Sequence, residues 1–462
     1  MTTLWAGRFD TEPDAAAFDF GASFRFDRRL FEDDVTGSIA WARALGRASV
    51  LPPKEAEQLE DALRGILKRG LTDPAFVDGA DEDIHSFVER LLVEQLGDTG
   101  RRLHTGRSRN EQVSLDFRLY LRRRIPVMQA AVAGVVEALA AQAAACGDAL
   151  MPAFTHFRPA QPVLVAHFLL SHAEPLIRDH DRLAQARHEA DALPLGSGAI
   201  AGTAYPIDVD ALAADLGFSR IVTNSIDASS DRDFAASFLY VASMTMVHLS
   251  RLAEDLIILC GDEHRFFELS DALSTGSSMM PQKKNPDPLE LVRGKTGRAI
   301  GHLIALMTTM KGLPTGYNKD LQEDKESVFG AEDTLQGCLA VVRSVVSGLT
   351  LNRTRAAAAA SGLLLATDVA DYLVGRGMPF RRAHEVVGGL VRTLVAEGRD
   401  FSSLSLDEWR AACELFGPDI AERVTPAVSV AAKRTPQSTA PDAVHARLAV
   451  VQRWASERVR SN

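Results

Sequence analysis

The stretch FAASFLYVASMTMVHLSRLAEDLIILC, residues 234–260, decides the fold class. Its large apolar side chains recur at steps of three or four residues, which is the period of an α-helix and not that of a half-buried strand. A helix of this length is about twice the mean length in globular proteins, and such helices are typical of bundles. The recurring positions are Phe234, Phe238, Val241, Thr245, Leu249, Leu252, Leu256 and Leu259.

Three further stretches, 163–183, 289–310 and 323–349, repeat this period. No segment alternates with period two for long enough to build a substantial sheet, so we predict an all-α fold with a central long-helix bundle. The segment LIILC at 256–260 is apolar on more than one helix face. Such a helix must be buried by more than its own domain, which predicts an oligomer assembled through the bundle.

A chain of 462 residues is long enough for about three domains. We predict an N-terminal mixed helical domain at 1–110, the long-helix bundle at 111–360 and a small helical domain at 361–462. In the first, residues 52–69 have the pattern of an amphipathic helix with Ala56, Leu59, Leu63 and Ile66 on one face. The last contains shorter helical patterns at 366–375, 381–397 and 406–416, separated by Gly and Pro.

Net charge and composition limit the classes of partner that the protein is expected to bind. The net charge is −10 without a long basic run, which argues against nucleic acid and anionic membranes but not against a small anionic substrate. The four cysteines are far apart and form no CxxC pair, which favours free thiols over a disulfide or metal site. The N-terminus has no secretory pattern and no apolar run approaches the ~20 residues that span a bilayer. We therefore expect a cytoplasmic protein.

The strongest polar segment is STGSSMMPQKKNPD, residues 274–287. Gly276 gives the backbone freedom, two serines follow, and Lys283, Lys284 and Asn285 come just before a helix that a proline can start. Small donors, lysines and helix-start N–H groups in one loop make an anion-binding site. The alternative reading of this composition is a solvated linker.

Three more polar segments interrupt or bound the long helices. They are TGRSRNEQ at 105–112, MPAFTHFRPAQP at 151–162 and LPTGYNKDLQEDK at 313–325. We predict that His156 lies in a proline-bounded loop and not on an apolar helix face. On composition alone, the first segment is equally well explained as a capped helix start. For the other two, composition alone favours the structural readings, a structural histidine and a charged loop that opens a helix.

These segments carry a family resemblance. GSSMMPQKKNPDPLE at 276–290 resembles the signature loop of the fumarase/aspartase superfamily, usually GSSxMPxKxNxxxxE. Its QKKNPD variant and YNKDLQEDKE at 317–326 resemble the argininosuccinate lyase branch and not fumarases or aspartases. Segments at 105–112 and 151–162 resemble the branch's TGRSRNDQ and MPGYTHLQxAQP. Supporting matches at 4–9, 81–85, 196–202, 224–234, 366–373 and 379–385 extend the resemblance over most of the chain.

The sequence also departs from the family pattern. Glu111 replaces the usual Asp, a one-methylene change that keeps the charge. Ala153 and Arg158 replace the usual Gly and Gln, and Ala153 argues against a backbone with positive φ at that position. DEHRFF at 262–267 stands where relatives carry a turn with Ser and Gly, and its sequence suggests no function.

The resemblance implies the three-domain fumarase/aspartase-type fold and a reversible anti β-elimination of argininosuccinate to arginine and fumarate, as in arginine biosynthesis or the urea cycle. No metal and no organic cofactor take part. A base removes a proton from the carbon beside a carboxylate, and the guanidino nitrogen leaves from the neighbouring carbon. The site must therefore concentrate positive charge and N–H donors where the carbanion's charge develops.

The resemblance also assigns roles to residues. Ser277 maps to the base, and a serine can serve only if Lys283 and backbone N–H groups depress its pKa strongly. His156, with Glu290 as its carboxylate partner, orients substrate or assists proton transfer. The expected substrate-binding residues are Ser23, Arg109, Asn110, Thr155, Asn285, Tyr317, Gln322 and Lys325.

These segments lie far apart along the chain and at the ends of long helices, so one subunit hardly brings them together. The resemblance implies a homotetramer whose central bundle builds each site from three chains. The competing readings are another fumarate-releasing lyase, such as adenylosuccinate lyase or an aspartase-like enzyme, and a non-catalytic protein like the delta-crystallins. The segment at 317–325 argues against the first, and the presence of Ser277, His156 and Lys283 argues against the second.

Overall fold

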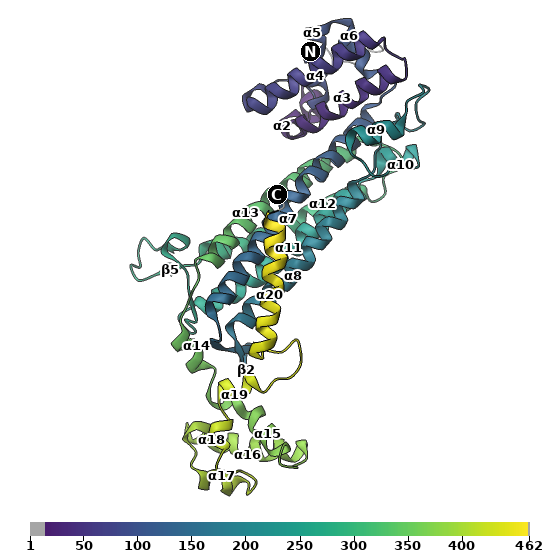
Figure 1. The fold of residues 1–462 in the computed structure, drawn as a ribbon. Helices are drawn as coiled ribbons and strands as arrows, with labels where there is room; N and C mark the ends of the chain where they lie inside the picture. Colours follow the sequence, from purple (N-terminus) through teal and green to yellow (C-terminus); the bar gives the residue numbers. More distant parts are fainter. Residues whose placement is uncertain (1–13, 461–462) are drawn as a thin grey trace. The chain divides into compact units, whose positions relative to one another are not determined.

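The computed structural model describes residues 14–460, and nearly all of its regular structure is helical (Figure 1). The matched segment at 4–9 therefore lies outside the described residues. The five longest bundle helices are α7 (Arg109–Cys146), α8 (Val165–Ala190), α11 (Asp233–Cys260), α12 (Asp287–Met310) and α13 (Asp324–Ser347). The predicted all-α class is confirmed.

The periodicity identified the bundle helices for a simple physical reason. All eight recurring positions of 234–259, from Phe234 to Leu259, are buried in α11. The three other stretches predicted at 163–183, 289–310 and 323–349 correspond to α8, α12 and α13, with ends that differ by a few residues. Burial of one helical face requires apolar side chains at this period, so the sequence reports it directly.

The chain divides into two compact units, each made of three separate stretches. Unit 1 contains 1–129, 181–244 and 297–335, and unit 2 contains 130–180, 245–296 and 336–462. Each of the five bundle helices gives one part to each unit. The three-domain division at 110 and 360 follows chain order and stays a prediction.

Unit 1 packs short helices beside the bundle segments. In α4 the buried positions are the four predicted ones, Ala56, Leu59, Leu63 and Ile66, and this helix packs on α3. The short helices are α1 (Ala15–Gly21), α2 (Phe24–Asp27), α3 (Phe31–Arg47), α4 (Pro53–Thr72), α5 (Ile84–Leu96), α6 (Asp98–Arg101), α9 (Val209–Leu216) and α10 (Ser225–Ser230), with 3-10 turns η2 (Arg28–Leu30), η3 (Pro74–Phe76), η4 (Arg102–His104) and η6 (Lys319–Glu323).

Unit 2 contains a small helical cluster whose core is aromatic, with Trp409 between Phe401 and Phe416. A capping box between Ser405 and Glu408 starts α17. Besides the bundle segments, unit 2 contains the helices α14 (Arg353–Ala359), α15 (Ala366–Val374), α16 (Phe380–Glu397), α17 (Leu406–Ala412), α18 (Ile420–Arg423), α19 (Pro426–Ala431) and α20 (Pro441–Arg460), with η5 (Asp271–Leu273), η7 (Gly362–Leu365) and η8 (Phe401–Ser403). Helix α20 lies along α8, where Arg447 pairs with Glu174 (Figure 1).

The strands of the described residues form three two-stranded antiparallel ribbons. These are β1 (Leu150–Thr155) with β2 (Arg158–Leu164), β3 (Phe267–Glu268) with β6 (Thr350–Leu351), and β4 (Thr275–Gly276) with β5 (Lys284–Asn285). The segment 151–162 is the β1–β2 hairpin and not an irregular loop, although His156 lies in its two-residue turn and not on a helix face, as predicted. Its prolines masked the strand signal, since proline is tolerated in edge strands and bulges, and here the register shifts between Ala153 and Phe154.

Helix α7 corrects a second sequence inference. By length and composition it is apolar enough to cross a membrane, so the statement that no apolar run approaches spanning length was too strict. However, 56% of its apolar window is buried inside the structure. The core helix of a helical bundle has this character, because it is covered on several faces.

Candidate functional site

A polar pocket in unit 1 gathers six of the predicted substrate-binding residues. Its space is about 110 Å³, and residues from η6 and from the starts of α2, α7 and α13 line it. The six predicted residues are Ser23, Arg109, Asn110, Tyr317, Gln322 and Lys325, and the lining is completed by Asp27, Glu82, Asp83, His85, Val113 and Lys319. We call this space the cationic pocket, because Arg109, Lys319 and Lys325 all reach it.

The N-terminal side of the cationic pocket is held by Asp27. Its Oδ2 accepts a hydrogen bond from Ser23 Oγ at 2.5 Å, and its Oδ1 accepts from the Ile84 N–H at 3.0 Å. Burial raises the pKa of Asp27, against the opposing effect of nearby His85. The Ser23 hydroxyl therefore has a fixed orientation at the pocket wall.

Arg109 begins α7 and is oriented by acidic and hydroxyl groups of α5. Its guanidinium donates to Asp83 Oδ2 at 2.7 Å and to Ser86 Oγ at 3.2 Å. Burial alone would raise the pKa of Asp83, but the charges of His85 and Arg109 hold it below its ordinary value. The ionised carboxylate of Asp83 therefore holds the Arg109 guanidinium in one orientation at the pocket wall.

The far wall comes from η6 and α13. Lys325 is 3% exposed, and its Nζ donates to Asp324 Oδ1 at 2.8 Å while Asp324 Oδ2 accepts from Arg232 Nε at 2.5 Å. Gln322 donates to the Gly21 carbonyl at 3.1 Å. Burial raises the pKa of Tyr317 to about 12, so its hydroxyl is a neutral donor at physiological pH.

Glu111, the departure from the family's Asp, has a structural role. Its Oε2 accepts from the N–H groups of Gly196 and Gly198 at 2.8 and 3.0 Å, and its Oε1 accepts from the Ser108 N–H at 3.1 Å. Its side chain is buried, and burial raises its pKa. Glu111 therefore ties the glycine-rich segment 196–202 to the start of α7.

The other six predicted residues lie in unit 2. Ser277, Lys283 and Asn285 belong to the 274–287 loop, which is closed at its base by the β4–β5 ribbon and stands clear of the helices of its unit (Figure 1). Lys284 holds this base, because its Nζ lies 2.8 Å from Asp271 Oδ1 and 3.3 Å from Glu268 Oε1. Thr275 donates to Asp287 Oδ2 at 2.6 Å and joins the loop to the start of α12.

Within the loop, backbone N–H groups bind the hydroxyl oxygen of Ser277, which is one of the two features that a serine base requires. Its Oγ accepts backbone N–H groups from Met279 and Met280, at 3.2 and 3.0 Å. These donors favour the charged form of the hydroxyl oxygen. Lys283 is exposed, and no ion pair or side-chain hydrogen bond of the described residues involves its ammonium group. The loop therefore presents one committed lysine, Lys284, and one available lysine, Lys283.

His156 lies at the tip of the β1–β2 hairpin. His156 and Phe157 have φ of 54° and 57°, as the two central residues of a type I′ turn require. Thr155, the last residue of β1, is exposed beside them. The departures Ala153 and Arg158 are accommodated, because Ala153 lies in β1 outside the left-handed region and Arg158 opens β2 with its side chain exposed.

A cavity of about 530 Å³ lies behind this hairpin within unit 2. His264, from the divergent segment 262–267, reaches it and packs its ring 5.3 Å from Phe154. The segment is held in place by Arg355, which donates to the carbonyls of Glu263 and His264. The divergent residues thus support the β1 strand that leads to His156.

Glu290, on α12, lies 4.0 Å from Arg293, and no hydrogen bond of the described residues joins it to His156. The His156–Glu290 pairing stays a prediction. Asp27, Asp83 and His85 also line the cationic pocket, although they are not among the predicted site residues. The matched segment at 81–85 contained the signal for two of them, since polar residues before a helix frequently face a site.

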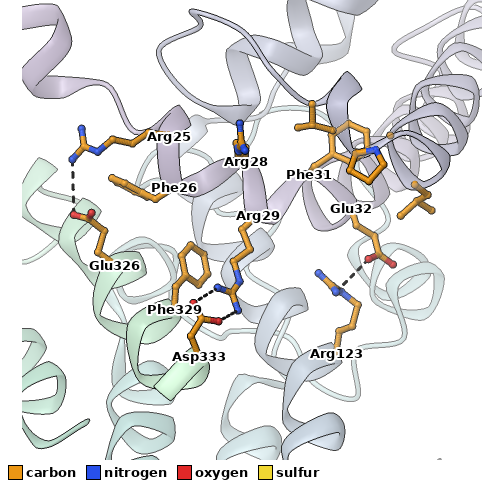
Figure 2. A pocket seen from close by; sticks show the side chains of 14 residues that line it. Arg25, Phe26, Arg28, Arg29, Phe31, Glu32, Arg123, Glu326, Phe329 and Asp333 are labelled. Carbon is orange, nitrogen blue, oxygen red and sulfur yellow. Dashed lines mark hydrogen bonds and ion pairs between the residues drawn. The ribbon is translucent and has the colours of Figure 1, made fainter. Parts of the chain in front are cut away.

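Unit 1 also has a larger cavity of about 630 Å³ with four arginines in its wall (Figure 2). Their charges are already balanced. Arg29 forms a double hydrogen bond with Asp333, Arg123 pairs with Glu32 and Arg25 points to Glu326, as Figure 2 shows. None of the predicted site residues lines this cavity, so we do not place the candidate site there.

The fold is that of the lyases of the fumarase/aspartase superfamily. A family model described as Lyase matches residues 7–301, and one described as Argininosuccinate lyase C-terminal matches residues 363–431. The argininosuccinate lyase of Roseiflexus sp. (strain RS-1) is 48% identical over 98% of this chain and 100% of its own length. That of Moorella thermoacetica is 48% identical over 96% of this chain and 95% of its own. The chain belongs to the argininosuccinate lyase family.

Solved structures agree on the fold. EDDS lyase in complex with formate superposes with a TM-score of 0.82 at 26% identity, covering 97% of this chain and 93% of that one. The class II fumarase of Schistosoma mansoni has a TM-score of 0.76 at 15% identity, covering 89% and 93%. The second likeness concerns the fold alone.

Proposed function

We propose that this chain cleaves argininosuccinate reversibly to arginine and fumarate by anti β-elimination. The observation that carries the proposal is the full-length match to argininosuccinate lyases, combined with a complete set of the expected residues. The cationic pocket supplies oriented positive charge for the substrate's carboxylates, and the 274–287 loop supplies the base.

The cationic pocket is pre-organised for anions. The side chains of Arg109 and Lys325 are each aligned by a buried carboxylate, Asp83 and Asp324 respectively, so little ordering is lost when substrate binds. Ser23, Asn110, Gln322 and the neutral Tyr317 add hydrogen-bonding groups around them. Such fixed donors stabilise developing negative charge better than mobile ones do.

In the reaction, Ser277 Oγ as the alkoxide takes the proton from the carbon beside a substrate carboxylate. The electron pair left on that carbon forms the C=C bond of fumarate as the bond to the guanidino nitrogen breaks, and this nitrogen takes up a proton and leaves in arginine. The N–H groups of Met279 and Met280 support the alkoxide, and the available ammonium of Lys283 supports the charge on the carboxylate. His156 assists the proton transfer to the leaving nitrogen.

We further propose that the active enzyme is a homotetramer with sites shared between subunits. The family resemblance implies this assembly, in which the six residues of the cationic pocket and the six of unit 2 form two sets. In addition, α12 exposes Ile300, Ile304 and Met307 by 38%, 59% and 58% at positions i, i+4 and i+7, an apolar stripe that a partner helix would cover.

Complementation between variants tests the shared site. Ser277→Ala and Lys325→Met are expected to be inactive separately, because each removes a residue from one of the two sets. Denaturing and refolding them together is expected to restore part of the activity, since some sites then combine an intact Ser277 set with an intact Lys325 set. Sites made within one chain would stay inactive in every mixture, and that result would refute sharing.

The activity is tested by following fumarate absorbance with argininosuccinate, adenylosuccinate and aspartate offered separately. We expect fumarate only from argininosuccinate, and release from another substrate instead would overturn the assignment. Ser277→Ala is expected to lose most turnover, whereas the neighbouring Ser278→Ala is the matched control and is expected to keep it. Equal activities of the two variants would reject Ser277 as the base.

We also propose a cytoplasmic location. The four cysteines are free, two of them buried, which supports a protein made in a reducing compartment. Cell fractionation with a specific antibody tests this, and recovery in a membrane or secreted fraction would contradict it.

A further inference from the structure

A buried carboxyl pair lies directly behind the cationic pocket. Asp34 of α3 and Asp116 of α7 are 1% and 0% exposed. Together with His85 of α5 they place one oxygen or nitrogen each within 4.8 Å of one another. His85 itself lines the cationic pocket, so this cluster adjoins the proposed substrate site.

The hydrogen bonds of this cluster are incomplete. Asp34 Oδ1 accepts from His85 at 2.8 Å and from Gln112 Nε2 at 2.6 Å. In contrast, Asp34 Oδ2 and both carboxyl oxygens of Asp116 have no donor among the described residues, and Asp116 Oδ2 lies 3.4 Å from His85 Nδ1 without forming a hydrogen bond. Two buried carboxylates left in this state would be strongly destabilising.

Three kinds of partner are chemically possible for these oxygens: a ligand, a metal ion or a proton. The cavity that touches Asp34 and His85 has only about 10 Å³, which is the space of one water and too little for an organic ligand. Asp116 does not line this cavity, so a water in it leaves the Asp116 oxygens without a donor. A divalent cation would lie next to Arg107, a buried guanidinium whose charge already acts on both carboxyl groups. A proton needs no space and adds the donor that is lacking.

The pKa values of Asp34 and Asp116 are shifted in opposite directions, which agrees with one proton on the pair. Burial would raise the pKa of Asp34, but His85, Arg107 and Gln112 hold it below its ordinary value. Burial and the neighbouring charge of Asp34 raise the pKa of Asp116 well above its ordinary value. Like charges this close cannot both ionise, and the one with fewer donors keeps the proton.

We propose that Asp116 is a neutral carboxylic acid that keeps its proton and donates a hydrogen bond to the Asp34 carboxylate, and that this pair positions His85 at the substrate pocket. Asp34 then remains an anion that accepts from His85 Nδ1, so the ring presents Nε2 to a molecule in the pocket. Asp34 and Asp116 are positioning residues, because they act on the substrate through His85.

A matched pair of substitutions tests this assignment. Asp116→Asn keeps a neutral group of the same shape with an N–H donor, so kcat/KM for argininosuccinate is expected to stay close to that of the unchanged chain. Asp34→Asn removes the anion that orients His85, and a loss of about 10- to 100-fold is expected, as for a hydrogen bond to a charged group. Asp116→Ala, which removes the donor, is expected to lose activity that Asp116→Asn retains.

The proton itself can be observed without any activity measurement. In chains labelled at the aspartate carboxyl carbons, a protonated carboxyl gives an infrared carbonyl band that carboxylates lack. We expect this band at neutral pH and its disappearance in Asp116→Asn. Absence of the band, a metal bound stoichiometrically to the purified chain, or an Asp116→Asn loss equal to that of Asp34→Asn would each overturn the proposal. The kinetic test rests on the proposed function, whereas the infrared and metal measurements do not, so the two failures are distinguishable.

Discussion

Replacing Glu111 by Ala removes three hydrogen bonds at one buried carboxylate. The substitution leaves the N–H groups of Gly196 and Gly198 without acceptors and frees the Ser108 N–H. A hydrogen bond to a charged group contributes about 1.5–3 kcal/mol, so the two glycine N–H groups alone account for about 3–6 kcal/mol. Part of this is offset, because burial raises the pKa of Glu111 and its removal relieves that desolvation. We expect a net loss of about 3 kcal/mol, a large share of a typical stability of 5–15 kcal/mol.

Urea unfolding of the Glu111→Ala chain, followed by circular dichroism, measures this loss. Hydrogen exchange at the amides of Gly196 and Gly198 locates it, because both are expected to exchange faster than in the unchanged chain. Glu111→Asp, the residue that the family usually carries, keeps the charge one methylene shorter and is expected to lose less. A stability of Glu111→Ala within about 0.5 kcal/mol of the unchanged chain, the range of ordinary surface substitutions, would refute the reasoning.

Three other pairs of substitutions are predicted from local geometry and burial. Gly198→Ala should destabilise the chain strongly, since φ is 59° and an added Cβ would lie 2.4 Å from the Gly202 carbonyl oxygen, whereas Gly65→Ala, in an open position of α4, should raise the melting temperature by the equivalent of about 0.5–1 kcal/mol. Burial lowers the pKa of His104 to about 4, whereas in the unfolded chain this histidine has a pKa of about 6.5. Between these values the unfolded chain binds a proton that the folded chain does not bind, so stability should fall as the pH drops from about 7 to 4. His104→Gln should flatten this fall in urea titrations at each pH, and the exposed His384→Gln should not. Lys283→Met should lower kcat at least about 100-fold by analogy with the loss of an oxyanion donor, while Lys284→Met, whose ammonium is bound to Asp271 and Glu268, should lower it less, and equal steady-state rates for the two would contradict the assigned roles.

The residues of the cationic pocket show which parts of the site sequence motifs can predict. Arg109, Asn110, Tyr317, Gln322 and Lys325 lie in matched segments, whereas Ser23 is implied by the family resemblance alone. The fold brings all six to one cavity. The carboxylates that orient their cations, Asp83 and Asp324, were not assigned a role in advance, although both lie in matched segments. Their importance depends on burial and on partners far along the chain, and neither can be read from a local pattern.

The amino-acid sequence by itself determined the helices. Apolar side chains at a period of 3.6 must share a face, and a shared apolar face must be buried, so α4 and α11 follow from local order alone. It also indicated a break between long helices at 274–287, since Gly276 and the prolines disfavour a helix there, although the β4–β5 ribbon at its base was not predicted.

Only the tertiary structure decided the β1–β2 hairpin and the carboxyl cluster. The turn at His156 and Phe157 needs positive φ without a glycine or asparagine, and pairing across the hairpin enforces what the local sequence disfavours. Asp34, His85 and Asp116 lie on three separate helices, and their joint burial changes the proton affinity of each carboxyl group. Electrostatic energy depends on distance and burial in space, which the order of residues along a chain does not specify.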